Sequence, residues 1–124
     1  MKTAPNQIVK NGNMAAQIIS APVDCRTKLA YSVQANSKTT GTLGGTWSLQ
    51  GSLDYQIDLN GNVLNAGNWQ TIANSSQAIS LSNTSGVTTW DFTQTGVPWV
   101  RAVYAPAGGD TGTANVFGYT KGNI

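Results

Sequence analysis

The stretch VTTWDFTQTGVPWVRAVYA, residues 87–105, decides the fold class. In Val87–Thr93 every second side chain belongs to one face, so that Trp90 and Phe92 point the same way. Trp99–Ala105 would place Trp99, Arg101 and Val103 on one face and Val100, Ala102 and Tyr104 on the other, with Arg101 as the one charge. A period of two over seven residues predicts a β-strand, and this stretch therefore predicts two of them.

The same pattern recurs along the chain, and no stretch of helical length has apolar residues at a spacing near 3.6. Clusters of Gly, Asn, Ser and Asp separate the runs, and Asn60-Gly61 predicts a two-residue hairpin turn. We predict an all-β protein with a single jelly-roll-like β-sandwich of about eight short antiparallel strands. The strands are expected at Met14–Ser20, Leu29–Gln34, Thr46–Gln56, Asn68–Ala73, Gln77–Leu81, Val87–Thr93, Trp99–Ala105 and Ala114–Thr120.

The two ends of this pattern define the domain organisation. Residues 14–124 form the predicted sandwich domain, whereas residues 1–13 lack a core pattern and are expected to be an extended arm that orders against a partner. Met1–Gln7 leads into a polar stretch, so we expect no secretory signal, and the short apolar runs predict no membrane span.

Composition argues against most enzymes. The chain of 124 residues has no His and no Glu, which excludes a Ser-His-Asp triad, a Cys-His pair and a His-rich zinc site. We therefore predict a binding or structural protein without catalytic residues, cofactor or metal. The net charge of +2 comes from scattered Lys and Arg, which does not favour specific nucleic-acid binding. Cys25 is the single cysteine and is expected to be a buried free thiol.

Two constellations have both a functional and a structural interpretation. Asp58–Asn62 resembles the start of a calcium loop, but Val63 and Trp69 stand where an EF-hand needs Gly and Glu, so a hairpin turn is expected instead. The four Trp residues could stack on sugars or fill the core, and the core is the expected place for most of them.

Arg101 is expected on a solvent or interface face; if it is buried, it needs an acidic partner such as Asp91 or Asp54.

The candidate contact residues, for a subunit interface or a glycan, are Trp47, Trp69, Trp99, Arg101 and Tyr104. They combine large aromatic groups with the one charge inside an apolar strand.

Three segments resemble a known family of proteins. Gly45–Asp54 fits a strand of the form W-x-(L/V)-Q-(G/A)-S-x-D, Asn68–Ile72 fits a later W-x-x-I, and Val97–Tyr104 leads into Gly112–Gly118 as a hydrophobic-R-hydrophobic-x-Y…G-T-G/A pair. This order is similar to that of small β-sandwich proteins from the structural genes of bacteriophages, over roughly residues 40–120.

The resemblance implies a virion structural protein that is made in the host cytoplasm and acts by symmetric assembly. A capsid-associated, decoration, spike-base or tail subunit fits the short length. The implied partners are further copies of the chain, for example in a trimer, and other virion proteins. The alternative is a carbohydrate-binding module that recognises a host surface glycan through exposed Trp, Tyr and Asn.

Overall fold

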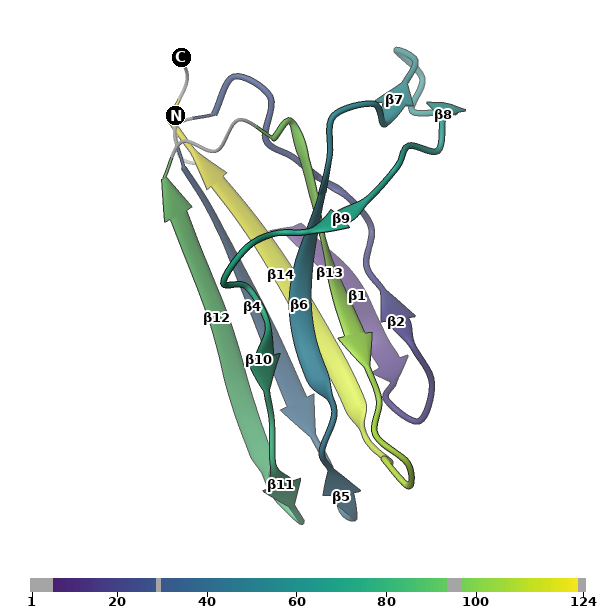
Figure 1. Cartoon of the computed structure of the whole chain (residues 1–124), viewed down its shortest axis with the longest axis vertical. Helices are drawn as coiled ribbons and strands as arrows, with labels where there is room; N and C mark the ends of the chain where they lie inside the picture. Colours follow the sequence, from purple (N-terminus) through teal and green to yellow (C-terminus); the bar gives the residue numbers. More distant parts are fainter. Residues whose placement is uncertain (1–5, 29, 94–96, 123–124) are drawn as a thin grey trace.

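The computed structural model describes residues 6–28, 30–93 and 97–122. Within these residues the chain forms fourteen strand segments and no helix, and every pairing between them is antiparallel. The prediction of an all-β fold is confirmed. Figure 1 shows the long strands running along the long axis of the molecule, with those of one sheet in front of those of the other.

The first layer is a four-stranded sheet that contains the longest strands. Its order is β1 (Asn6–Asn13), β14 (Thr113–Lys121), β4 (Ala30–Lys38) and β12 (Ser85–Thr93). The ladders of β4 with β12 and with β14 run without a register shift over nine residues each. This sheet is therefore regular everywhere except at β1.

The second layer is a six-stranded sheet in which only the two central strands are long. Its order is β10 (Gln77–Ala78), β6 (Thr46–Ser52), β13 (Trp99–Ala105) and β2 (Ile18–Ile19). In addition β9 (Gln70–Thr71) pairs with β6, and β3 (Val23–Asp24) pairs with β13. Two small ladders join β5 (Thr42–Leu43) to β11 (Leu81–Ser82), and β7 (Gln56–Ile57) to β8 (Val63–Asn65).

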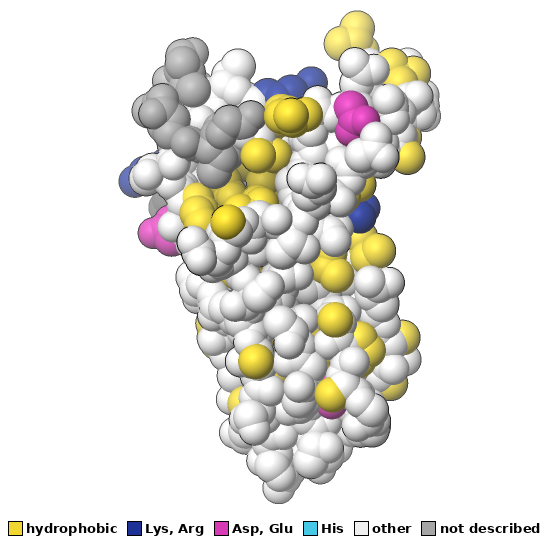
Figure 2. Space-filling model, viewed as in Figure 1, with side chains coloured by type: hydrophobic (Ala, Val, Ile, Leu, Met, Phe, Trp, Pro, Cys, Tyr) yellow, Lys and Arg dark blue, Asp and Glu magenta, His cyan; other side chains and the backbone are white. Residues whose placement is uncertain are grey.

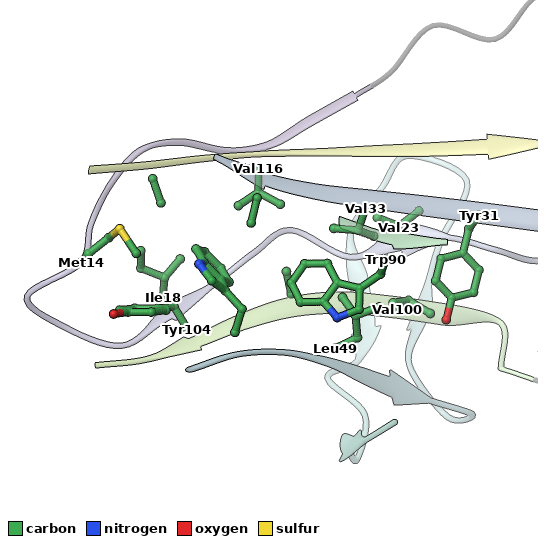
Figure 3. Close-up of a cluster of buried hydrophobic side chains, with 14 of the residues drawn as sticks. Met14, Ile18, Val23, Tyr31, Val33, Leu49, Trp90, Val100, Tyr104 and Val116 are labelled. Carbon is green, nitrogen blue, oxygen red and sulfur yellow. The ribbon is translucent and has the colours of Figure 1, made fainter. Parts of the chain in front are cut away.

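One hydrophobic core lies between the two sheets, as Figure 3 shows. Val33, Trp90 and Val116 enter it from the four-stranded sheet, while Leu49 and Val100 enter it from the other. The alternation of buried and less buried residues along β4, β12 and β14 accounts for the inner face of the first sheet, because successive side chains of a strand point to opposite faces.

Buried indole N–H groups are satisfied across this core. Trp47 donates to Ser37 Oγ at 3.0 Å, which connects β6 with β4, and Trp90 donates to the carbonyl of Ser75 at 2.6 Å. The Trp47 ring packs edge-on to Trp90 with their centroids 6.5 Å apart. Hydrogen-bonded aromatic residues thus join the two layers, as buried Trp side chains require.

The expected strands match the structure best where alternation is unbroken. Trp99–Ala105 is found as predicted, and Val87–Thr93 lies within β12. Of the expected strand Met14–Ser20 only Ile18–Ile19 forms a strand, β2, because Asn13 first turns the chain by accepting hydrogen bonds from Ala15 N at its side chain and from Ala16 N at its carbonyl. Leu29, the first residue of another expected strand, lies outside the described residues.

Residues 6–13, which belong to the expected arm, form β1 and pair with β14 of the same chain. Two register shifts interrupt the pairing, and Asn11 has a φ of 51°. These irregularities explain why the segment has no period of two in its sequence. Residues 1–5 of the expected arm lie outside the described residues.

Candidate interaction surface

A long excursion of the chain stands at one end of the sandwich. We call residues 53–69 the extension, since they leave β6 after Ser52 and return at β9. The extension holds the β7–β8 hairpin, which Figure 1 shows projecting beyond the ends of both sheets. At its tip Gly61 has a φ of 83° and its N–H donates to the carbonyl of Asp58 at 3.1 Å.

The predicted turn at Asn60-Gly61 is therefore present, but within a longer loop in which only the glycine has a positive φ. Asp58 Oδ1 accepts from the N–H groups of Asn60 and Asn62 at 2.8 and 2.9 Å. These bonds, with those from Asn62 first, hold the pKa of the Asp58 carboxyl below its usual value. Its oxygens organise a turn, as expected for a hairpin rather than a calcium loop.

A row of aromatic rings fixes the extension to the outer face of the six-stranded sheet. Tyr55 of the extension packs on Trp99 of β13, with centroids 4.9 Å apart, and on Trp69 with centroids 5.5 Å apart. The guanidinium of Arg101 lies 4.2 Å from the Trp69 centroid, and that of Arg26 lies 4.7 Å from the Trp99 centroid. The extension is thus held between two cation–π contacts.

Each of these guanidinium groups has a polar partner. Arg101 Nε donates to Gln50 Oε1 at 2.9 Å, and burial lowers the pKa of Arg101. Arg26 donates through Nε and Nη2 to the carboxylate of Asp24 at 2.9 and 2.8 Å. The acidic partners considered for Arg101 are engaged elsewhere, since Asp91 accepts from Ser32 and Asp54 from Asn68. Arg101 therefore relies on an amide and a ring.

A carboxylate closes the base of the extension. Asp54 Oδ1 accepts from Asn68 N at 2.7 Å, and Oδ2 accepts from Asn68 Nδ2 at 2.8 Å, while Ser52 Oγ donates to Oδ1 at 2.9 Å. The bonds from Asn68 and then Ser52 lower the pKa of Asp54. Because Asp54 and Asn68 stand fourteen positions apart, this clamp joins the outgoing and the returning chain.

Apolar side chains gather on the outside of the extension. Leu53 is 77% exposed, Leu64 66%, Val63 55%, and Leu59 at the tip is as exposed as in an open peptide at 105%. Figure 2 shows hydrophobic side chains on this projecting part of the molecule. A groove of about 780 Å³ lies at its base, lined by Leu53, Ile72 and polar side chains that include Asp54 and Asn68. Several large apolar side chains exposed on one projecting segment make it a candidate interaction site.

Two of the five predicted contact residues lie in the core instead. Trp47 and Tyr104 are both fully buried, with ring centroids 5.0 Å apart, and their rings cannot meet a ligand in the folded chain. Alternation placed them on the inner faces of β6 and β13, where a large ring contributes most to stability.

Tyr104 also anchors a buried carboxylate at the end of the sandwich opposite the extension. Its hydroxyl donates to Asp110 Oδ2, which also accepts from Ala107 N at 3.0 Å, while Oδ1 accepts from Gly44 N at 2.8 Å. Burial opposes the charge of Asp110, but these bonds hold its pKa below the usual value. A Cβ at Gly45 would clash with the Tyr104 hydroxyl, so this position requires glycine.

The other three predicted contact residues come together under the extension. Trp69 is half-buried with Arg101 over its ring, and Trp99 is 5% exposed between Tyr55 and Arg26. Trp90, the fourth Trp, is 3% exposed in the core. The structure thus brings Trp69, Trp99 and Arg101 into one cluster, in which they hold the extension in place.

The extension contributes residues that sequence reasoning missed, namely Leu53, Tyr55, Leu59, Val63 and Leu64. The signal for Leu59 was present, because it stands between Asp58 and Asn60 in a predicted turn and an apolar side chain in a turn has no core to enter. Tyr55 gave no such signal, since its partners are distant in sequence.

The remaining reactive groups are dispersed. Among the described residues no three His, Cys, Asp or Glu side chains come together in a way that could hold a metal. Cys25 is buried, and burial followed by the charge of Asp24 raises its pKa to about 12. A thiol with that pKa is protonated and unreactive at neutral pH.

Comparison with known proteins gave no assignment: neither a protein-family model nor a curated protein sequence matches the chain. Within the described residues no helix is long and apolar enough to cross a membrane.

Proposed function

We propose that the chain is a structural subunit of a bacteriophage virion, which acts by symmetric assembly through surfaces outside its core. The observation that carries this proposal is the extension, where leucine and valine side chains are exposed while rings and hydrogen bonds fix the backbone beneath them. A rigid apolar projection is suited to contact a neighbouring subunit, because little conformational entropy is lost on binding.

We infer a jelly-roll topology from the strand order. Counting β2 with β3 and β9 with β10 as single broken strands, and setting aside the β5–β11 and β7–β8 ladders, eight strands remain. One sheet then holds the first, eighth, third and sixth, and the other holds the second, seventh, fourth and fifth. This is the order of a jelly roll. Jelly rolls occur in viral capsid proteins and in lectins, so the topology supports the virion proposal without excluding sugar binding.

The surface chemistry supports assembly in many copies. The chain has few charges and many amide and hydroxyl side chains, a composition suited to hydrogen-bonded interfaces that contain water. In a closed shell or ring each contact can be modest, because the other contacts of the same subunit raise its effective concentration.

The proposal is tested on particles of the virus that encodes the chain. Particles purified on a density gradient are digested, and the copy number of the chain is measured by mass spectrometry against the major capsid protein. We expect many copies per particle. Copies at trace level, or recovery of the chain only in the supernatant of the lysate, would contradict a structural role in the virion.

A second candidate, carbohydrate binding, is favoured by one surface only. On the outer face of the four-stranded sheet, Phe117 and Tyr119 of β14 flank Gln34 of β4, and a hollow of about 240 Å³ lies between them. Half-exposed rings beside amide groups suit a sugar ring. The Trp side chains give less support, since three are buried and Arg101 covers the ring of Trp69.

This second candidate is tested by screening the protein on a glycan array, with Tyr119→Ala beside the wild type. Binding of a defined glycan that is lost in the variant would favour it. Absence of binding in the wild type would remove it.

A further inference from the structure

We propose that the free edge of β12 pairs antiparallel with β12 of a second copy, so that the two four-stranded sheets become one continuous sheet. The inference names a partner for the proposed assembly and rests on that function. Among the described residues β12 pairs with β4 and with no other strand, and it is the outermost strand on the left of Figure 1.

The hydrogen bonds show which backbone groups of β12 face outward. Thr39 N donates to the carbonyl of Thr84 at 2.9 Å, so even-numbered residues in this register bond to β4. Because bonding alternates along an antiparallel strand, the N–H and C=O groups of odd-numbered residues point away from β4. Gln77 Nε2 reaches one of them, the carbonyl of Thr89, at 3.2 Å. The outward groups are those of Ser85, Val87, Thr89, Asp91 and Thr93.

Proteins commonly block such an edge with bulges, charges, prolines or short strands. The opposite edge of the same sheet is blocked in this way, since β1 has two register shifts, a positive φ at Asn11 and the charge of Lys10. The edges of the six-stranded sheet are made of two-residue pieces. In the described chain β12 alone presents nine regular residues at an edge, about 30 Å of strand, without proline or lysine and with Asp91 as its one charge.

A second copy of β12 is complementary to this edge. With a two-fold axis at Thr89 all nine residues overlap, Thr89 faces Thr89 of the partner subunit, and Val87 faces Asp91 of the partner subunit. Directly opposed threonines favour pairing, whereas an axis at Asp91 would oppose two like charges. Thr89 would form a narrow, doubly hydrogen-bonded pair, in which the N–H of Thr89 of the partner subunit would share or replace Gln77 Nε2 at the outward carbonyl. The contact is isologous and closes as a dimer.

The test places a charge on the proposed axis. In Thr89→Lys two lysines would face each other, and we expect the dissociation constant of the dimer to rise at least about tenfold. Gln34→Lys is the matched control, because Gln34 is Thr89's neighbour on β4, is also exposed and lies one strand in from the edge. Sedimentation velocity of the full chain, from micromolar to millimolar concentration, measures both.

Mixing Thr89→Lys with Thr89→Asp is the decisive experiment. Opposed lysine and aspartate favour pairing, so the mixture is expected to form a one-to-one dimer that neither variant forms alone. A monomeric wild type, an equal effect of Gln34→Lys, or a mixture that stays monomeric would overturn the edge pairing. If the wild type forms an oligomer and Thr89→Lys leaves that oligomer intact, the edge pairing is overturned as well. The virion proposal is then decided separately, by the copy number of the chain in purified particles.

Discussion

The two ends of the sandwich differ in the kind of side chain that is unusually placed: one end buries a charged carboxylate, and the other exposes large apolar side chains. At one end a carboxylate is buried, with Asp110 5% exposed and hydrogen-bonded to Tyr104, Gly44 and Ala107. At the other end Leu59 is fully exposed on a hairpin whose backbone is fixed. The buried carboxylate of Asp110 forms its hydrogen bonds within the chain. The side chain of Leu59, in contrast, is fully exposed and packs against no core in the described part of the chain.

This difference separates residues that stabilise the fold from residues available for assembly. A buried carboxylate is tolerated because its bonds are complete, so any change to it affects folding. Exposed leucines on a rigid projection add nothing to the core, so changes to them should leave folding intact. The following substitutions test this separation from the largest expected effect on stability to the smallest.

Among the changes at the two ends of the sandwich, Asp110→Ala should cost the most, about 3 kcal/mol of unfolding free energy, because it leaves the Tyr104 hydroxyl and the Gly44 N–H buried without an acceptor. Urea denaturation followed by Trp fluorescence measures it. Asp91→Ala is the control, since Asp91 is exposed and, within the described residues, its carboxylate accepts from Ser32 Oγ, so its cost should stay below about 0.5 kcal/mol. Equal costs would show that the buried network does not stabilise this end.

Trp69→Ala should have an intermediate effect, about 1–2 kcal/mol, because it removes the ring between Tyr55 and Arg101. The main change should be local: the extension separates from the sheet and becomes sensitive to protease within residues 53–69. Trp69→Phe keeps a ring for Arg101 and should retain most of the protection. If Trp69→Ala is cleaved no faster than the wild type, the aromatic row does not hold the extension.

Acid should weaken the core end first. The folded-state pKa of Asp110 is lowered, so its contribution is complete above the unfolded pKa near 3.9 and is lost as pH falls through the folded value. Unfolding free energy should therefore fall below about pH 4, and Asp110→Asn should flatten that dependence. Asp54→Asn should change it less, because Asp54 clamps only the extension. A larger effect of Asp54→Asn than of Asp110→Asn on this pH dependence would contradict the view that Asp110 stabilises the fold and Asp54 only the extension.

Leu59→Ser should have the smallest effect, within about 0.5 kcal/mol of the wild type, since the side chain buries nothing. Its effect should appear in assembly, as fewer copies incorporated into particles. Leu49→Ser is the contrasting variant, because Leu49 is fully buried and the change should destabilise the fold strongly. Unchanged incorporation of the folded Leu59→Ser protein would remove the extension from the assembly contacts.

Sequence reasoning predicted the fold class from the recurring short strand-like runs, and it predicted the strand Trp99–Ala105, whose side chains are buried on both faces except at Arg101 and Ala105. It failed at Asn13, where a side chain accepts a backbone N–H and turns the chain instead of letting the strand continue. It also failed at β3, β5 and β11, because a strand of two residues has no period to detect. Strand β1 was also missed, because its two register shifts leave no period of two in its sequence.

For the candidate surface, alternation placed Trp99 and Arg101 on one face but could not show that another part of the chain covers it. Burial on the outer face depends on Tyr55 and Trp69, which approach only after the extension folds back. Tyr104 lies on the inner face of β13, where it is fully buried and its hydroxyl donates to Asp110.

Amide exchange in β12 at low and high protein concentration tests symmetric assembly most directly. Thr88 and Trp90 bond to β4 and should be protected at both concentrations, whereas the outward amides of Val87, Thr89 and Asp91 should exchange fast when dilute and become protected when concentrated. Residue-resolved NMR distinguishes the two sets. Fast exchange of the outward amides at every concentration would contradict pairing through this edge.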